Sequence, residues 1–119
     1  MTRVVLISPF VAERTALQQL LTDDGYEVAA AATREDGLDL AVRDHPDVLI
    51  ADAQVAGLDG LALILALTER DVHPRVLLLC PRARRRFEKG RVVCLPKPID
   101  LDLLRRYLDE TELTESQVA

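Results

Sequence analysis

The chain has 119 residues, of which 49% are hydrophobic, and this is enough for one domain with a buried core. Its formal net charge of -5 argues against a nucleic-acid-binding protein, because phosphate backbones are bound by basic surfaces. No apolar run is long enough to cross a membrane and no signal peptide is evident, so we expect a cytoplasmic protein without a membrane partner.

Short apolar runs alternate along the chain with segments of helical periodicity. The runs predict five strands, at residues 4–7, 27–31, 48–51, 75–79 and 91–95. A first helix is expected to end at Gly25, a typical stop signal. Thr33, followed three residues later by Asp36, resembles a capping box that begins a second helix, and Pro46 ends it.

A third helix is predicted from about Gly60 to Arg70, and a last helix begins after Asp100. The segment before the last strand has room for at most a short fourth helix. Because parallel neighbours need crossover connections, this alternation predicts a doubly wound α/β fold around a five-stranded, all-parallel sheet. We assign residues 1–111 to one domain and residues 112–119 to a frayed acidic tail.

Asp52 directly follows the apolar run at residues 48–51. Such a run is typical of a strand that is buried on both faces. A carboxylate at its C-terminal end lies at the edge where parallel α/β sheets place their ligands. Asp52 is therefore the first candidate for a functional residue.

Several residues together carry a resemblance to a known family. They are, in chain order, Phe10, Arg14, Asp52, Leu58-Asp59-Gly60-Leu61 and Lys97-Pro98. With these marks, residues 3–108 resemble a receiver domain of the two-component response regulators. The resemblance implies a flavodoxin-like fold with strand order 2-1-3-4-5. It also implies that Asp52 accepts a phosphoryl group from a histidine kinase, that Lys97 neutralises the acyl phosphate, and that the Lys97–Pro98 bond is commonly cis.

The chain departs from the family where the acidic pair that binds Mg²⁺ is expected, because Ser8 and Pro9 stand there. Mg²⁺ prefers several hard oxygen ligands, and only Asp52 and the main-chain carbonyl of Gln54 remain as weak candidates. We therefore expect no cofactor, with Mg²⁺ binding weak or absent and phosphorylation of Asp52 severely impaired. A direct ion pair between Asp52 and Lys97 is expected instead, in which each charge favours the other's ionised form.

The positions that relay phosphorylation in the family also depart from its pattern. Cys80 stands at the Ser/Thr position and is a weak donor, and Cys94 aligns with the switch aromatic. The two cysteines are expected at the same end of adjacent strands. They would form either a redox-controlled disulfide or, as we prefer, two free thiols that behave as small hydrophobic residues.

Two segments are candidate interfaces. Residues 61–67 are apolar almost all round, although a surface helix needs only one apolar stripe, so Ala62, Leu65 and Ala66 are predicted to be exposed. They would contact a partner or a second copy of the chain, unless the helix is merely rich in alanine and leucine. A basic cluster would bind an acidic partner, unless it is a solvated loop; it comprises Arg82, Arg84, Arg85 and Arg86.

The predicted function is an atypical, non-enzymatic receiver domain in bacterial two-component signalling. It would act mainly as a phosphorylation-independent protein–protein interaction module, with a histidine kinase or a downstream effector as partner. One alternative is a single-domain response regulator that accepts phosphate on Asp52. Another is a small anion- or nucleotide-binding module, for which the chain offers no glycine-rich phosphate loop.

Overall fold

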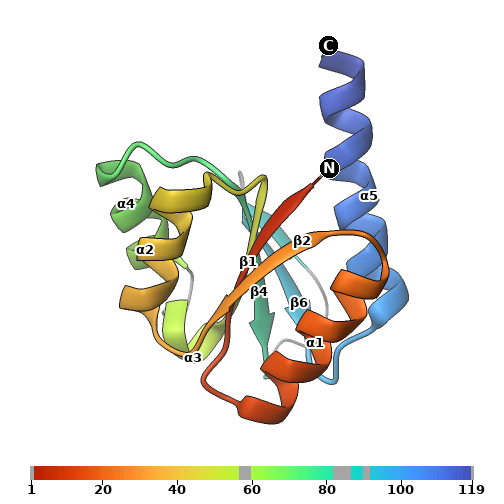
Figure 1. Ribbon diagram of the computed structural model, residues 1–119, viewed down its shortest axis with the longest axis horizontal. Helices are drawn as coiled ribbons and strands as arrows, with labels where there is room; N and C mark the ends of the chain where they lie inside the picture. The colour runs from red at the N-terminus through yellow and green to blue at the C-terminus, as the bar shows by residue number, and fades with distance from the viewer. Residues whose placement is uncertain (1, 57–59, 82–86, 90–91, 119) are drawn as a thin grey trace.

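One sheet separates two layers of helices in the computed structural model, which describes residues 2–56, 60–81, 87–89 and 92–118 (Figure 1). The strands are β1 (Arg3–Ile7), β2 (Glu27–Ala31), β3 (Val48–Asp52), β4 (Arg75–Cys80), β5 (Phe87–Lys89) and β6 (Val92–Pro96). The helices are α1 (Val11–Asp23), α2 (Arg34–Asp44), α3 (Ala53–Ala56), α4 (Leu61–Glu69) and α5 (Leu101–Val118). Helices α2, α3 and α4 lie on one face of the sheet, and α1 and α5 lie on the other (Figure 1).

The strand order is β2-β1-β3-β4-β6-β5. The first five of these are parallel and reproduce the predicted order 2-1-3-4-5, so the flavodoxin-like fold is confirmed. All five predicted strands are parallel, and the sequence missed only a sixth strand, β5, which pairs antiparallel with β6 at the edge of the sheet. Only two residues separate the paired Lys89 and Val92, which is the spacing of a tight hairpin rather than of a crossover helix.

Of the described residues between β4 and β6, residues 87–89 form the strand β5. The sequence had left room in this segment for at most a short fourth helix. The sequence also missed α3, a short helix that begins directly after β3. The residues after Thr111 were predicted to fray, but the backbone of α5 continues to Val118. This stretch contains neither Gly nor Pro to end a helix and is rich in Glu, Leu and Gln, which favour helices.

Alternate residues of the central strands pack into two separate cores. On one face, Leu6 of β1 and Ile50 of β3 pack with residues of α1 and α5 such as Leu21 and Leu104. On the other face, residues of α2 and α4 cover Ile7 and its neighbours. All five residues of β3 are buried, and the apolar run at residues 48–51 predicted this burial for a central parallel strand.

Local signals in the sequence account for several helix ends. The Thr33 side chain accepts a hydrogen bond from the Asp36 amide (3.2 Å), and Asp100 caps α5 by accepting one from the Leu103 amide (3.1 Å). Gly25 lies beyond α1 with φ of 98°, which glycine adopts readily. None of the helices in the described part of the chain combines the length and the hydropathy that a membrane span requires.

Candidate functional site

Asp52 lies at the carboxyl end of β3 with its side chain fully buried (0% exposed). Its Oδ1 atom accepts a hydrogen bond from the Gln54 amide (3.0 Å), so Asp52 also begins the short helix α3. Because β1, β3 and β4 are parallel, their carboxyl ends meet at this edge of the sheet. The sequence therefore located this carboxylate correctly, at the edge where such sheets place their ligands.

The Lys97 ammonium contacts the Oδ2 atom of Asp52, and the ion pair that the sequence predicted is present. Lys97 directly follows β6, and its amide donates a hydrogen bond to the Cys80 carbonyl of the neighbouring strand (3.3 Å). The Lys97–Pro98 bond is cis, as the resemblance implied. The loop after β6 thus brings Lys97 over the end of β3.

Glu13 is a second partner of Lys97, and sequence reasoning missed it. Its Oε1 atom lies 2.7 Å from the Lys97 Nζ atom, and its side chain is 16% exposed. Glu13 stands in the first turn of α1, which begins at the same edge of the sheet. A signal was available, since a carboxylate in the first turn after β1 can reach back to the mouth of the sheet.

Ser8 holds Glu13 in this position. The fully buried Ser8 hydroxyl donates a hydrogen bond to the Glu13 Oε2 atom (2.6 Å) and accepts one from the Phe10 amide (3.2 Å). The Arg14 side chain donates a hydrogen bond to the Ser8 carbonyl (2.7 Å), which fixes the backbone of the same turn. The Phe10 ring lies 4.9 Å from the Lys97 Nζ atom and adds a cation–π contact.

The charges of this cluster stabilise one another. Burial alone would lower the pKa of the Lys97 ammonium, but its hydrogen bonds to Asp52 and Glu13 outweigh burial, so this pKa lies above its usual value. Lys97 therefore carries its positive charge at neutral pH. We call the cluster of Asp52, Glu13 and Lys97 the Lys97 triad.

The donor groups around the Lys97 triad do not fit the Mg²⁺ ion that the family resemblance implies. Both carboxylates are directed at the Lys97 ammonium, and Pro9 provides no side-chain ligand. Among the described residues, no group of three or more His, Cys, Asp or Glu side chains is placed to hold a metal ion. In this arrangement, the positive charge next to Asp52 comes from the protein itself.

The two cysteines lie on neighbouring parallel strands. Cys94 of β6 pairs in register with Leu78, two residues before Cys80 of β4, so both thiols lie on the same face of the sheet. Both thiols are free; Cys94 is buried and Cys80 is partly buried. Burial, reinforced by a hydrogen bond with Cys80, raises the pKa of Cys94 to about 12. Cys94 is therefore a neutral thiol at physiological pH.

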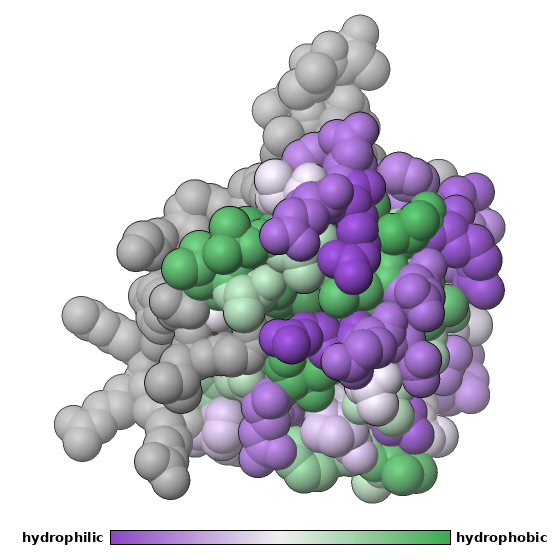
Figure 2. Space-filling model, turned by 90° about the vertical axis from the view of Figure 1, so that its left-hand side faces the viewer, coloured by the Kyte–Doolittle hydropathy of each residue, from purple (hydrophilic) through white to green (hydrophobic). Residues whose placement is uncertain are grey.

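The predicted interface on the third helix corresponds to α4. Ala62 and Leu65 are exposed, with Leu65 at 55%, and Leu61 is equally exposed. Ala66 is only partly exposed, contrary to prediction, because it follows Leu63 by three residues and packs on the flank of the core. On the side of the molecule that α2 and α4 cover, Figure 2 shows hydrophobic side chains between polar ones.

Two groups of residues that the sequence analysis singled out lie outside the described residues. They are the family marks Leu58 and Asp59, and the basic cluster Arg82, Arg84, Arg85 and Arg86.

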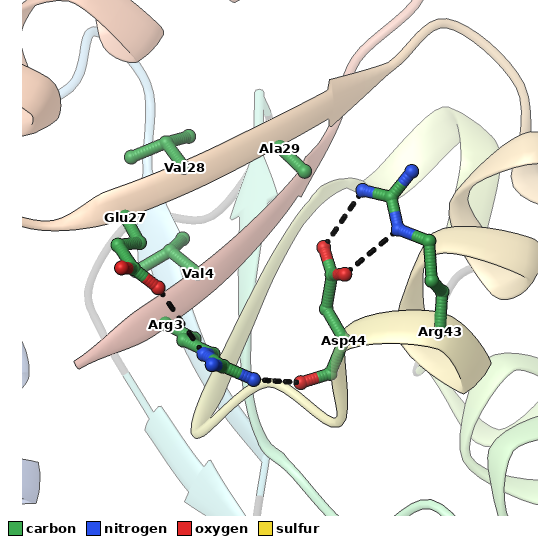
Figure 3. Close-up of a pocket in the computed structure, with 7 residues that line it drawn as sticks. All are labelled: Arg3, Val4, Glu27, Val28, Ala29, Arg43 and Asp44. Carbon is green, nitrogen blue, oxygen red and sulfur yellow. Dashed lines mark hydrogen bonds and ion pairs between the residues drawn. The ribbon is translucent and has the colours of Figure 1, made fainter. Parts of the chain in front are cut away.

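A pocket at the opposite end of the parallel strands contains two arginines (Figure 3). Arg3 pairs with Glu27 (3.1 Å) and donates to the Asp44 carbonyl (3.2 Å), while Arg43 binds both carboxylate oxygens of Asp44 (2.8 and 3.0 Å). Because both guanidinium groups already have carboxylate partners, this pocket is poorly suited to an anionic ligand.

Comparison with known proteins agrees with this architecture. The family described as "Response regulator receiver domain" matches residues 4–109. The transcriptional regulatory protein AfsQ1 of Streptomyces coelicolor is 38% identical over 78 residues, which make up 66% of this chain and 35% of that protein. Sporulation initiation phosphotransferase F of Bacillus subtilis is 22% identical over 108 residues, 87% of each chain.

A solved receiver-domain structure is also similar to this chain. The receiver domain from hybrid histidine kinase CckA superimposes with a TM-score of 0.76 and 28% identity, over 92% of this chain and 97% of that one. The chain spans about a third of the length of the first of the curated relatives above. The family match, the strand order and the buried Asp52 beside Lys97 agree, and the chain belongs to the response regulator receiver domain family.

Proposed function

We propose that this receiver domain acts as a phosphorylation-independent protein–protein interaction module in two-component signalling. The observation that carries the proposal is the Lys97 triad, in which a lysine ammonium lies between the Asp52 and Glu13 carboxylates. Phosphoryl transfer depends on positioning and on a metal that neutralises developing charge. Here the lysine is engaged by both carboxylates, and Ser8 and Pro9 stand where the family has its acidic pair.

The state of Asp52 supports the same proposal. Its Oδ1 atom accepts from the Gln54 amide and its Oδ2 atom binds Lys97, so both oxygens already have partners. The side chain is fully buried. For Asp52 to attack a phosphodonor, at least one oxygen would have to leave its partner and reach solvent. The site also offers few oxygen ligands to a divalent cation that would compensate the charge of the donor.

The proposed partner is a signalling protein, either a histidine kinase or a downstream effector. The names of the similar proteins, a transcriptional regulator and a hybrid histidine kinase, support this choice of class. The proposed contact surface is the exposed part of α4 around Ala62 and Leu65, because an apolar side chain on a helix surface can be buried by a partner. Association of two copies through the same surface is the alternative use of this face.

A phosphodonor assay tests the proposal. The chain is incubated with acetyl phosphate and Mg²⁺, and its intact mass is measured; we expect no phosphoryl adduct on Asp52. In the organism that encodes the protein, Asp52→Asn should preserve signalling while Leu65→Glu abolishes it. A stable adduct, or loss of signalling in a folded Asp52→Asn variant, would contradict the proposal.

The second candidate function is a response regulator that is phosphorylated on Asp52. One observation favours it: Asp52 and Lys97 still lie together at the carboxyl ends of the strands, as the family pattern requires. Binding of an anion or a nucleotide receives no comparable support, because Arg3 and Arg43 in the described pocket are already paired.

A further inference from the structure

We propose that Cys80 and Cys94 form a reversible oxidation site, at which a hydroperoxide converts the two thiols into a disulfide between β4 and β6. The proposal goes beyond the proposed function and does not depend on it, because neither cysteine belongs to the Lys97 triad. The sequence favoured two inert thiols. The structure adds a contact between them, and this contact allows the two sulfur atoms to react with one another.

The first support is the position of the two thiols. Strands β4 and β6 are parallel neighbours, and Cys94 pairs in register with Leu78, so Cys80 is a diagonal neighbour of Cys94 on the same face of the sheet. A hydrogen bond joins the two thiol groups. The two sulfur atoms are therefore in direct contact.

The second support is the difference in exposure between the two cysteines. Cys80 is partly exposed at the end of β4, whereas Cys94 is 1% exposed and packs in the core with residues such as Leu78. An oxidant from solvent can therefore reach Cys80 but not Cys94. An accessible cysteine that reacts first, next to a second cysteine that resolves the product, is the usual arrangement of a redox-sensing pair.

The reaction has two steps. The Cys80 thiolate attacks one oxygen of the hydroperoxide and the O–O bond breaks, which leaves a sulfenic acid on Cys80 and releases water or an alcohol once the leaving oxygen takes up a proton from solvent. The Cys94 sulfur then attacks the Cys80 sulfur, the S–O bond breaks, and the oxygen leaves as water with the proton of the Cys94 thiol. The two sulfur atoms together lose two electrons, which reduce the peroxide.

The disulfide would act on the Lys97 triad through the ends of the strands. A disulfide holds its two residues closer than diagonal neighbours in a sheet usually lie, so its formation draws Cys80, the last residue of β4, toward β6. The Cys80 carbonyl accepts a hydrogen bond from the Lys97 amide (3.3 Å). Movement of Cys80 therefore displaces the backbone of Lys97, and oxidation of the two cysteines is coupled to the triad.

Titration of the reduced chain with hydrogen peroxide tests the proposal, with the intact mass and the free thiols measured in denaturant. The wild-type monomer should lose two hydrogen atoms and both free thiols, and peptide mapping should link Cys80 to Cys94. A thiol reductant should restore the original mass. Cys80→Ala should react with peroxide at least about tenfold more slowly than wild type, and Cys94→Ala should stop at a sulfenic acid that dimedone traps on Cys80.

Three results would overturn the proposal. The first is a wild-type chain that keeps both thiols under conditions that fully oxidise glutathione in the same solution. The second is a disulfide that forms only between two chains. The third is equal reactivity of Cys94 in Cys80→Ala and of Cys80 in Cys94→Ala, with both variants shown to be folded by circular dichroism.

The coupling to the Lys97 triad has its own readout in the wild-type chain. In ¹H–¹⁵N NMR spectra recorded before and after oxidation, the signal of the Lys97 amide should shift and should return on reduction. An unchanged Lys97 signal in a chain that carries the disulfide would overturn the coupling.

Discussion

Glu13 and Lys97 lie near opposite ends of the chain, yet their carboxylate and ammonium groups are 2.7 Å apart. The contact joins the start of α1 to the loop after β6 across the mouth of the sheet. With Asp52 on the other side of the ammonium, it completes a closed cluster at the carboxyl ends of the parallel strands.

Glu13→Gln should destabilise the fold and lower the pKa of Lys97. The variant weakens a hydrogen bond between charged groups, and such bonds contribute about 1.5–3 kcal/mol. Because Glu13 is one of the groups that raise the pKa of Lys97, its neutralisation shifts that pKa downward. Urea denaturation measures the free energy of unfolding, and ¹⁵N NMR of the Lys97 side chain measures the pKa.

Glu35→Gln is the matched control for this substitution. Glu35 is also a glutamate in the first turn of a helix, so both variants lose the same favourable interaction with a helix N-terminus. Unlike Glu13, it is exposed. Equal destabilisation by the two substitutions would show that the contact between Glu13 and Lys97 contributes nothing of its own.

The alkaline stability of the protein should depend on Cys94. The pKa of this thiol rises from 9.0 to about 12, mainly through burial. Above the lower value the unfolded chain releases the proton while the native chain keeps it, so stability from this group is complete below about pH 9 and is lost toward about pH 12. Urea midpoints across this range should fall more steeply for wild type than for Cys94→Val. Parallel pH profiles of the two proteins would contradict this assignment.

The sequence was informative where one physical requirement dominates a segment. The apolar run before Asp52 needed burial on both faces, and this requirement placed the strand, its end and the carboxylate correctly. The ion pair of Asp52 with Lys97 was predicted from the resemblance to receiver domains, because this chain has Ser8 and Pro9 where the family has its acidic pair. The first prediction needed only the sequence pattern, and the second needed the family resemblance.

The sequence was uninformative where two weak local preferences compete or where a side chain acts across elements. The segment that contains β5 has no strong periodicity, and only pairing with the free edge of β6 makes it a strand. Glu13 looks like any exposed acid in the first turn of a helix, where acids are common. Its role appears only when α1 and the loop after β6 are brought together.

Gly37→Ala should destabilise the fold, although alanine favours a helix over glycine by about 1 kcal/mol. A Cβ atom at Gly37 would lie 2.2 Å from the Ile7 Cδ1 atom and 2.5 Å from its Cγ1 atom. Ile7 is fully buried in β1, so α2 would have to move away from the sheet. Overpacking of this kind costs about 1–3 kcal/mol.

Ile7→Val provides the test of this mechanism, because it removes the Cδ1 atom. In a double-mutant cycle measured by urea denaturation, Gly37→Ala should destabilise the Ile7→Val protein less than the wild type. Additive effects would show that the contact between α2 and β1 is not the cause.

Leu65→Glu should abolish partner binding and leave the fold intact. More than half of the Leu65 side chain is exposed, and surface substitutions of this kind usually change stability by less than about 0.5 kcal/mol. Leu63→Ala is the contrasting variant, since Leu63 is fully buried on the same helix and its truncation should lower stability by about 2–5 kcal/mol. Urea denaturation of both variants separates folding from binding, and analytical ultracentrifugation tests self-association through α4. If Leu65→Glu keeps both the association state and the signalling output of the wild type, α4 is not the interface, and the contact must be sought elsewhere on the domain.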